Sequence, residues 1–288
     1  MNLTNKTIIK DLLKRHEAKP EKYLGQHFIL SKKALTQMVA AAEIKKNDTI
    51  IEIGPGLGAL TQELAKTGAK IIAIEKDLKM ISILKETLAD YKNIKIVRAD
   101  ARKLLILRID SGYKIVANLP YNVATFLIHQ WLDPPPSLKL RRARPKLMVL
   151  MIQKEVAQRI CSKPPHMNLL AVSTQLLAIA KVVDYVSAKA FWPKPKVNSA
   201  IIKIIPASGQ PPRNCGAVVK AGFSQPRKQL IGNLVKKMGI PREIILDIYE
   251  KLNIQKKIRA ENLSLENWIV LAKEIDKEFS AKGGSASG

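Results

Sequence analysis

The sequence has few acidic residues for its length and lacks any long apolar run. Among 288 residues, 24 are Asp or Glu and 49 are Lys or Arg, so the formal net charge is +25. Such an excess is costly in self-repulsion unless the partner is a polyanion, which favours RNA or DNA, with an anionic membrane surface as the second choice. No run of 18 apolar residues occurs, so the sequence predicts no membrane-spanning helix.

Cysteine and histidine are scarce too. Cys161 and Cys215 lie far apart in the chain, a pattern typical of reduced thiols in a reducing compartment. The four histidines show none of the spacings of metal ligands, so we expect no metal. The first residues are too polar for a secretory signal, and Asp11 and Glu17 argue against an organelle transit peptide. We therefore expect a cytoplasmic protein.

The residues from 49 to 206 alternate between two periodicities. Runs rich in β-branched residues alternate with helical stretches, an order typical of an α/β fold with a parallel sheet covered on both faces. The expected strands are 49–53, 70–75, 94–97, 113–117 and 146–152, and the expected helices between them are 58–67, 77–90 and 122–132. A further helix at 168–179 precedes β-rich runs at 180–186 and 198–205, which predict an antiparallel pair at one edge of the sheet.

The pattern changes after Pro206. Residues 208–214 are rich in Pro, Gly and polar residues, as in a linker, and only helical patterns follow. The expected helices are 215–224, 226–238, 241–251 and 264–279, with Pro226 and Pro241 in first turns. The chain thus divides into a larger α/β domain, an all-helical domain and a flexible tail, at residues 1–207, 208–282 and 283–288.

Three glycines follow the first expected strand of the α/β domain. Gly54, Gly56 and Gly58 lie between the strand 49–53 and the helix 58–67, where glycine permits a tight turn and lets a ligand lie against bare backbone. The helix N-terminus behind them offers unpaired N–H groups. A glycine loop of this kind is weak evidence by itself, because dinucleotide enzymes use similar loops.

Three acids narrow the class of ligand. Glu75 ends the second strand, where a carboxylate accepts hydrogen bonds from the two ribose hydroxyls of NAD or of S-adenosylmethionine. Glu52 ends the first strand, and Asp100, followed by Ala101, comes after the third strand, where it can meet an adenine amine. Glu52 and Asp100 favour the methyl donor S-adenosylmethionine. The plainer alternatives are a solvated strand-end carboxylate at Glu75 and a helix cap at Asp100.

A second motif, Asn118-Leu119-Pro120-Tyr121, follows the fourth strand at the carboxyl edge, where open α/β sheets bind ligands. An adenine amine is a poor nucleophile, because its lone pair is delocalised into the ring. The Asn118 side-chain oxygen and the Leu119 carbonyl can each accept one N–H, which favours a pyramidal nitrogen. Pro120 fixes the backbone, and Tyr121 offers a face for the base to stack on. Alone, the motif also fits a strand that ends in a proline turn, but after the glycine loop and the three acids it predicts methyl transfer to adenine.

Aromatic and basic residues elsewhere fit a nucleic-acid substrate. Phe191 or Trp192 can close the other face of the base, although hydrophobic cover for the sheet edge is the alternative. The segment 133–146 is Pro-rich and then basic, and it is either a solvated loop or an RNA contact. The basic residues that we expect to contact RNA are Arg141, Arg142, Arg144, Arg227 and Lys228.

These motifs resemble the ribosomal RNA small-subunit adenine dimethyltransferase family, of the KsgA type. The resemblance covers nearly the whole chain and is carried by the segments 22–30, 52–61, 74–77, 99–101, 118–121, 151–160, 190–201, 222–234 and 258–268. It implies a Rossmann-like, S-adenosylmethionine-dependent methyltransferase domain followed by a small C-terminal helical domain. It also implies dimethylation of two adjacent adenosines near the 3′ end of small-subunit rRNA, by a monomer that acts on a pre-ribosomal particle.

The same resemblance implies which residues contact the donor and the base. The implied donor contacts are His27, Ile29, Gly54, Glu75, Asp100 and Asn118, and Phe191 corresponds to the family's aromatic residue. The chain departs from the family pattern at His27, where Asn is usual, at Pro226, where a basic residue is frequent, and before 168–176, where Tyr-Gly is usual.

Three other functions fit parts of the pattern. A large-subunit rRNA adenine methyltransferase of the antibiotic-resistance type is the nearest, but residues 56–61 and 259–262 favour the small-subunit type. A non-catalytic RNA-binding assembly factor has no need of Asn118, and a DNA adenine methyltransferase would more often show a different proline motif and a larger target-recognition region.

Overall fold

The computed structural model describes residues 1–21, 24–102, 112–134 and 144–283, with side chains as far as residue 278. The chain forms two compact units: Met1–Ala157 with Ala180–Pro206, and Gln158–Ile179 with the residues from Ala207 onward. We call the second unit the helical unit. Its stretch from Ala207 begins close to the predicted domain boundary at residue 207. Its other stretch, residues 158–179, lies within the part of the sequence that was predicted to belong to the α/β domain. The division into domains at residues 1–207, 208–282 and 283–288 stays a prediction.

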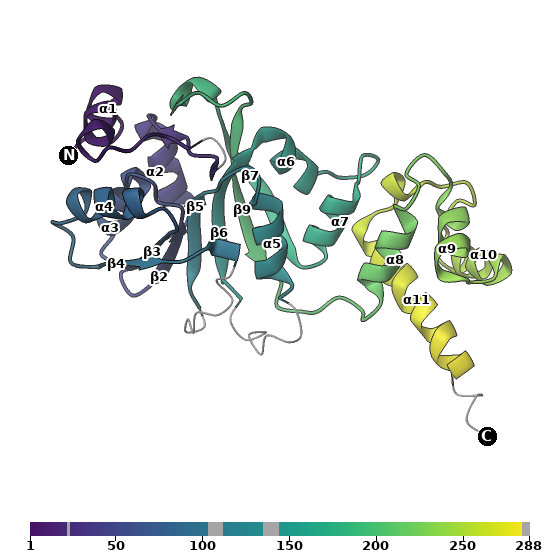
Figure 1. Ribbon diagram of the computed structural model, residues 1–288. Helices are drawn as coiled ribbons and strands as arrows, with labels where there is room; N and C mark the ends of the chain where they lie inside the picture. The colour runs from purple at the N-terminus through teal and green to yellow at the C-terminus, as the bar shows by residue number, and fades with distance from the viewer. Residues whose placement is uncertain (22–23, 103–111, 135–143, 284–288) are drawn as a thin grey trace. The chain divides into compact units, whose positions relative to one another are not determined.

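The described strands and helices follow the predicted order closely (Figure 1). The strands are β1 (Phe28–Ile29), β2 (Thr49–Ile53), β3 (Lys70–Glu75), β4 (Ile94–Arg98), β5 (Lys114–Asn118), β6 (Leu147–Gln153), β7 (Ala178–Val186), β8 (Phe191–Trp192) and β9 (Ser199–Pro206). The helices are α1 (Lys6–Arg15), α2 (Lys32–Ala41), α3 (Ala59–Ala65), α4 (Leu78–Thr87), α5 (Ala124–Leu132), α6 (Lys154–Ile160), α7 (Leu169–Gln175), α8 (Cys215–Gly222), α9 (Leu230–Met238), α10 (Arg242–Lys251) and α11 (Leu265–Gly283).

The larger unit is built on a sheet whose described strands run in the order β4-β3-β2-β5-β6-β9-β7. The five strands from β4 to β6 are parallel, and β9 pairs antiparallel with β6, so the sheet is closed at this side by β9 and β7. Residues of β2, β5 and β6 are buried on consecutive positions rather than alternate ones. This burial is expected where helices cover both faces of a parallel sheet, so the predicted Rossmann-like fold is confirmed.

Two predicted helix bounds are wrong. The helix predicted at 168–179 ends at Gln175, because Ala178 already begins β7. The helix predicted from residue 226 begins only at Leu230, and Pro226 lies in a turn before it. Gln229 forms a β-bridge with Arg259, and the Leu230 N–H donates to the Ile258 carbonyl at 2.9 Å. That long-range pairing holds the backbone before Leu230 extended.

The helical unit packs around Trp268, which is fully buried. Its indole lies so close to Gly222 that a Cβ at this position would come within 2.4 Å of the Trp268 ring. The Asn233 side-chain amide donates to the Gly222 carbonyl at 2.6 Å and to the Gln225 carbonyl at 3.0 Å. Gly222 is therefore required for the close approach of α8 to α11 and α9.

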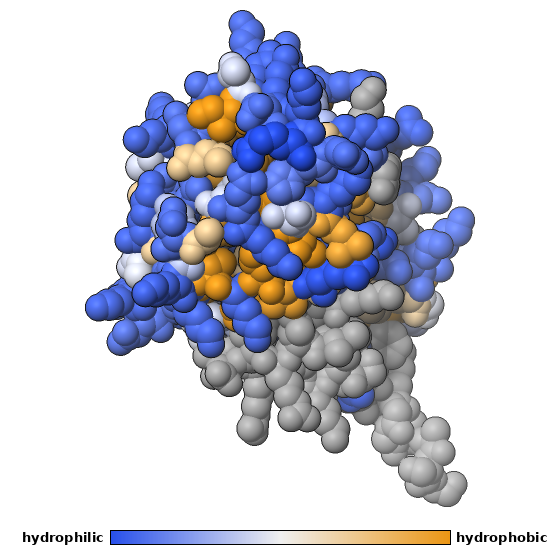
Figure 2. Space-filling view, turned by 60° about the vertical axis from the view of Figure 1, so that its left-hand side comes forward, coloured by the Kyte–Doolittle hydropathy of each residue, from blue (hydrophilic) through white to orange (hydrophobic). Residues whose placement is uncertain are grey.

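None of the helices in the described part of the chain combines the length and the apolarity that crossing a bilayer needs. On the face drawn in Figure 2, hydrophilic side chains predominate and surround a central group of apolar ones.

Candidate active site

Four neighbouring strands deliver the predicted motifs to one edge of the sheet. In the order β4, β3, β2 and β5, the carboxyl ends lead to Asp100, Glu75, the loop Gly54–Gly58 and Asn118. The register places Glu52 beside Ala73 of β3, and Arg98 beside Glu75. Because parallel strands end at the same edge, residues more than 60 positions apart in sequence become neighbours.

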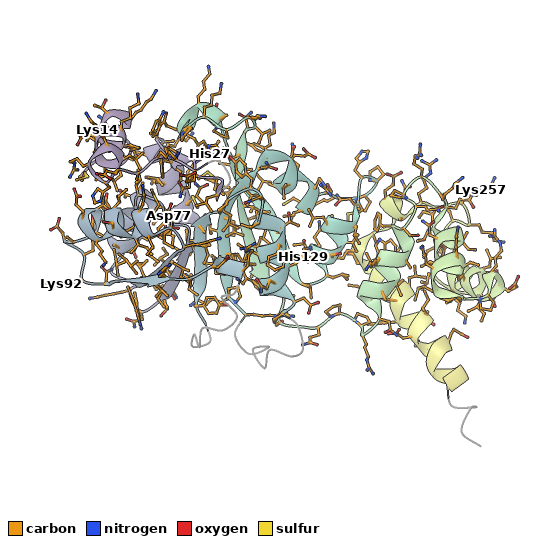
Figure 3. The ribbon with its side chains drawn as sticks, viewed as in Figure 1. Lys14, His27, Asp77, Lys92, His129 and Lys257 are labelled. Carbon is orange, nitrogen blue, oxygen red and sulfur yellow. The ribbon has the colours of Figure 1, made fainter. Side chains whose placement is uncertain are left out.

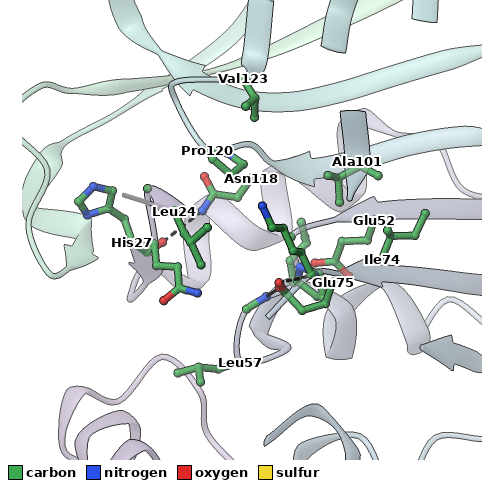
Figure 4. A pocket seen from close by; sticks show the side chains of 18 of the residues that line it. Leu24, His27, Glu52, Leu57, Ile74, Glu75, Ala101, Asn118, Pro120 and Val123 are labelled. Atoms are coloured by element: carbon green, nitrogen blue, oxygen red, sulfur yellow. Dashed lines mark hydrogen bonds between the residues drawn. The ribbon is translucent and has the colours of Figure 1, made fainter. Parts of the chain in front are cut away.

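A cavity of about 310 Å³ lies at this edge, within the size range of small-molecule sites (Figure 4). Its lining brings together most of the predicted cofactor residues with part of the proline motif. The predicted residues in the lining are His27, Ile29, Glu52, Gly54, Gly56, Glu75, Asp100, Ala101, Asn118 and Pro120. Gly58, Leu119, Tyr121 and Phe191 are not among the lining residues.

The three glycines of the loop have different surroundings. Gly54 and Gly56 have positive φ angles of 63° and 58° and line the cavity, so they supply the backbone surface that the sequence predicts. Gly58, with φ of 94°, begins α3 instead, and a Cβ there would lie 3.1–3.2 Å from the Leu88 and Leu84 methyl groups. The glycine at 58 is thus required by packing against α4 rather than by the cavity.

Two buried carboxyl groups, Glu52 and Glu75, face the cavity from adjacent strands. Glu52 is 1% exposed, and its Oε2 atom has no hydrogen-bond partner among the described residues. Burial raises the pKa of Glu52 to about 8. Glu75 accepts backbone N–H groups from Lys76 at 2.7 Å, Asp77 at 2.9 Å and Gly56 at 3.4 Å. Burial also raises the pKa of Glu75, although these N–H groups oppose the effect.

Asp100 carries its charge, unlike Glu52. The Arg102 guanidinium donates to both oxygens of the Asp100 carboxylate at 2.6–3.2 Å, and Lys76 Nζ lies 3.4 Å away. The Arg102 hydrogen bonds hold the pKa of Asp100 well below its ordinary value. Lys76 and Arg102 both line the cavity, so the part of the lining around Asp100 carries two positive charges and one negative charge.

The orientation of the Asn118 amide follows from its neighbour. Asn118 Nδ2 donates to the His27 carbonyl oxygen at 3.2 Å (Figure 4). Since a carbonyl can only accept, the NH₂ group must face it and the Oδ1 atom must point the other way. The His27 carbonyl thus fixes the orientation of the amide of this lining residue and leaves the Oδ1 atom outside that contact.

The rest of the proline motif is fixed by contacts behind the cavity. Leu119 is buried, and its N–H donates to the Met151 carbonyl at 3.1 Å. The Tyr121 hydroxyl lies 2.6 Å from Ser199 Oγ, and its ring lies 5.9 Å from the His27 ring between centroids, with 28° between planes. Burial raises the pKa of Tyr121, so the phenol stays protonated at neutral pH.

The aromatic pair predicted to flank the base lies on β8. Phe191 is 3% exposed and belongs to a core cluster that includes Ile29, Leu35 and Val149. Trp192 is half-buried and stacks on Phe28, with 6.3 Å between ring centroids. The pairing of β1 with β8 brings the motif at 22–30 next to the motif at 190–201. A role of Phe191 at the base stays a prediction.

The N-terminal segment forms a wall of the cavity that the sequence did not predict in full. Leu3, Leu24, Gly25, Gln26 and Phe28 join His27 and Ile29 in the lining. The Gln26 amide donates to the Asp77 carboxylate at 3.0 Å. A Cβ on Gly25, whose φ is 65°, would come within 3.3 Å of Pro120 Cβ. The glycine at 25 could have been recognised as a site residue only from this contact between distant segments.

The predicted basic contacts fall into three groups. Arg141 and Arg142 lie outside the described residues, and Arg144 is half-buried just before β6. Arg227 and Lys228 line a surface pocket of the helical unit together with Lys257 and Arg259, which the sequence analysis did not single out. Figure 3 shows Lys257 at the surface of this unit. In the part of the chain that the structure describes, no group of three or more His, Cys, Asp or Glu residues is arranged to hold a metal ion.

Comparison with known proteins identifies the family. The profile described as "Ribosomal RNA adenine dimethylase" matches residues 17–277. The chain belongs to this family. Two similar proteins are named "Ribosomal RNA small subunit methyltransferase A". The one from Dehalococcoides mccartyi is 38% identical, over 92% of this chain and 91% of that protein. The one from Clostridium botulinum is 36% identical, over 90% and 95%.

Solved structures agree with the fold of the family. A dimethyladenosine transferase from Plasmodium falciparum superposes with a TM-score of 0.74 at 26% identity, over 88% of this chain and 98% of that chain. The 23S rRNA methyltransferase ErmE superposes with a TM-score of 0.70 at 23% identity, over 86% and 99%. The latter likeness concerns the fold alone. The chain is thus an enzyme of the rRNA adenine dimethylase family with a Rossmann-like fold.

Proposed function

We propose that this protein transfers methyl groups from S-adenosylmethionine to the exocyclic amines of two adjacent adenosines near the 3′ end of small-subunit rRNA. The observation that carries the proposal is the meeting of two motifs in one cavity. The glycine loop with Glu75 forms one side, and Asn118, whose amide orientation is fixed by the His27 carbonyl, forms another. The small-subunit name of the relatives from D. mccartyi and C. botulinum supports this substrate over large-subunit rRNA.

The residues of the cavity fit the methyl donor. Gly54 and Gly56 leave room against the backbone, and Glu75 offers carboxylate oxygens for the ribose hydroxyls. The buried Glu52 Oε2 atom has no hydrogen-bond partner among the described residues, and a cationic ligand would satisfy it. Asp100 is held by Arg102, so an adenine amine must share that carboxylate with the guanidinium or displace it. The donor supplies an electrophilic methyl group on a positively charged sulfur.

Asn118 acts on the other reactant, the adenine amine. Its Oδ1 atom and the Leu119 carbonyl accept the two N–H bonds, which directs the nitrogen lone pair away from the ring and toward the methyl group. As the nitrogen gains positive charge, these contacts become stronger, so they stabilise the transition state more than the bound base. The Asn118 bond to His27 fixes the acceptor in place before the substrate arrives.

Tyr121 provides the stacking face. Its hydroxyl is held by Ser199 and its ring lies near the His27 ring, so the ring keeps a defined plane for the extruded base. His27 is oriented in turn, because its Nδ1 atom lies 2.7 Å from the Pro193 carbonyl and must donate to it. These contacts support a role for Tyr121 beside the cavity, although the residue does not line it.

We further propose that the helical unit contacts the rRNA backbone of a pre-ribosomal particle. Arg227, Lys228, Lys257 and Arg259 share one surface pocket and supply several positive charges to it. Each phosphate contact that is removed should lower the slope of log affinity against log salt by about 1. Reversal of Arg227 and Lys228 to Glu should therefore weaken RNA binding and flatten its salt dependence, while donor binding is unchanged.

Mass spectrometry of rRNA nucleosides tests the central proposal. Cells that carry the gene should contain dimethyladenosine in small-subunit rRNA, and cells without it should lack it. Purified protein with S-adenosylmethionine should restore the modification on small-subunit particles from the deficient cells. Modification of large-subunit rRNA instead, or no modification of either, would overturn the proposal.

A further inference from the structure

Phe126 is an aromatic residue whose side chain is exposed to solvent. It lies on α5 and is 53% exposed, although neighbouring positions of the same helix, such as Leu127 and Ile128, are fully buried. Only 5% of the residues in this chain are aromatic. Single exposed apolar residues are common on protein surfaces, so the position of Phe126, rather than its exposure alone, must show what it binds.

That position is the rim of the proposed active site. Val123, three residues before Phe126, lines the cavity, and its side chain is drawn there in Figure 4. Gln130, four residues after Phe126, donates to the carbonyl of Arg102 at 3.1 Å, and Arg102 also lines the cavity. Residues three and four apart share one face of a helix, so Phe126 lies on the face that borders the cavity.

Within the helix face that borders the cavity, the part that carries Phe126 is exposed to solvent. Val123 and Gln130 are seven residues apart and almost in line along α5. Leu127 lies to one side of that line and is fully buried, and Phe126 lies to the other and is exposed. The Cα atom of Phe126 lies slightly less than one helical turn from that of Val123, a rise of about 4.5 Å along the axis, and Phe126 is five residues from Tyr121 in the chain.

The charge of the rim fits a nucleic-acid strand. Lys76 and Arg102 line the same cavity, and the side chain of each is 53% exposed; both are paired with Asp100, so the group has one net positive charge. Cations that border an exposed aromatic ring are the combination by which proteins hold single strands, since the cations follow the phosphates and the ring stacks on a base.

We propose that Phe126 is the stacking platform for the nucleotide next to the target adenosine. The inference rests on the proposed function, since it takes RNA as the substrate. When one adenosine is extruded into the cavity, its neighbour loses a stacking partner. The exposed ring at the rim replaces that partner within one nucleotide step. Because the two target adenosines are adjacent, the second of them occupies the platform while the first is methylated.

The probe is a short single-stranded RNA with two adjacent adenosines, in which 2-aminopurine replaces the base on either side of the target. Stacking on Phe126 should quench its fluorescence in the wild-type complex. Phe126→Ala should abolish the quench and weaken RNA binding by about 5- to 150-fold, the range for loss of one base–aromatic stack. Phe126→Trp should retain the fluorescence quench and the RNA affinity of the wild type. The affinity for S-adenosylmethionine should be the same in all variants.

Tyr185→Ala is the matched control, because Tyr185 is 50% exposed on β7 and does not line the cavity. It should retain the quench and the affinity. Unchanged RNA binding in Phe126→Ala, or an equal loss in Tyr185→Ala, would overturn the proposal. Failure of the proposed function is distinct from either result, since the wild-type protein would then methylate no adenosine in the small-subunit particle.

Discussion

Buried acids lie at both ends of the same parallel strands, and their surroundings are opposite. At the amino end, the Asp48 carboxylate accepts from Lys114 at 2.8 Å and from Lys146 at 2.7 Å. Burial acts to raise the pKa of Asp48, but these hydrogen bonds outweigh it and hold the pKa well below its ordinary value. At the carboxyl end, Glu52 and Glu75 have no lysine or arginine bound to them in the described structure, and burial raises the pKa of both.

The contrast separates stabilising acids from binding acids. A buried charge is stable when a counter-charge and hydrogen bonds accompany it, and Asp48 has both. A buried carboxyl group without a counter-ion, in a cavity, is stable only in its neutral form or with a ligand that supplies the missing charge. Titratable residues with strongly perturbed pKa values in a cleft are candidates for function, and here the two ends of one sheet provide the comparison within one molecule.

Removal of Asp48 should produce the largest effect on stability. Asp48→Ala leaves the Lys114 ammonium, which is about 5% exposed, with only the carbonyls of Ala42 and Glu43. Loss of one partner from a buried pair costs about 3–5 kcal/mol, and urea denaturation measures this free energy. Lys146→Ala is the control: its side chain is 49% exposed, so the loss should be about 0–1 kcal/mol. Equal losses would show that burial of Lys114 does not set the cost.

Removal of the Asn118 amide should affect turnover rather than stability. Asn118→Ala deletes one preorganised acceptor, which we expect to lower the methylation rate by roughly 10²–10³, as for a single oxyanion-hole group. RNA affinity should remain nearly unchanged, because the contact strengthens mainly in the transition state. Single-turnover methylation of small-subunit particles, alongside RNA binding, measures both. Tyr121→Ala should instead weaken binding as well, and a wild-type rate in Asn118→Ala would exclude this loop as the catalytic site.

The two ends of the sheet were not equally predictable from sequence. The residues at the carboxyl end could be predicted, because Glu75 and Asn118 end β-rich runs and Asp100 comes shortly after one. Parallel strands bring such positions together at one edge of the sheet. The cluster at the amino end depends on Asp48, Lys114 and Lys146, whose spacing carries no local signal. Pairing over long distances in the chain also moved the start of α9 to Leu230 and placed Phe191 in the core.

For the same reason, the sequence could not predict which residues of the motifs line the cavity. The spacing of glycines could not distinguish Gly56, which lines the cavity, from Gly58, which packs on α4. The helix α1 was not predicted, because the residue pattern of its segment is only mildly amphipathic. Its apolar residues Ile9, Leu12 and Leu13 become informative once Met80 and Ile83 are known to cover them. Local pattern fixes strands and their ends, whereas contacts between distant segments decide which residues face the ligand.

Removal of the Glu75 carboxylate should weaken donor binding by a moderate amount. Glu75→Ala should lose roughly 1.5–3 kcal/mol of S-adenosylmethionine affinity, the range for hydrogen bonds to a charged group. Calorimetric titration measures the loss. Glu63→Ala is a control that should bind normally, because Glu63 on α3 is half-buried, pairs with Lys66 and does not line the cavity. Unchanged affinity in a folded Glu75→Ala protein would place the ribose contacts elsewhere.

The pH dependence of stability tests the carboxyl end of the sheet most directly. The pKa of Glu52 is about 8 in the folded protein, against an ordinary value of 4.5. Between these values the folded chain keeps the Glu52 proton and the unfolded chain has lost it. The stability is therefore fully present below about pH 4.5 and is lost as the pH rises toward 8, by about 1.4 kcal/mol per pH unit. Urea denaturation of the ligand-free protein between pH 5.5 and 8.5 measures this slope.

Glu52→Gln isolates the contribution of this one group. The amide has the shape of the protonated acid and does not titrate, so the variant should lose less stability per pH unit than the wild type over the same window. Glu75 is present in both proteins, and its charge helps to raise the pKa of Glu52, so the difference between the two slopes includes the interaction between these carboxyl groups. A cationic donor favours the ionised carboxylate, so its affinity for the wild type should increase with pH up to about 8, and its affinity for Glu52→Gln should not. Parallel stability curves for the two proteins would mean that Glu52 is ionised in the ligand-free protein, and the contrast between the two ends of the sheet would then rest on Glu75 alone.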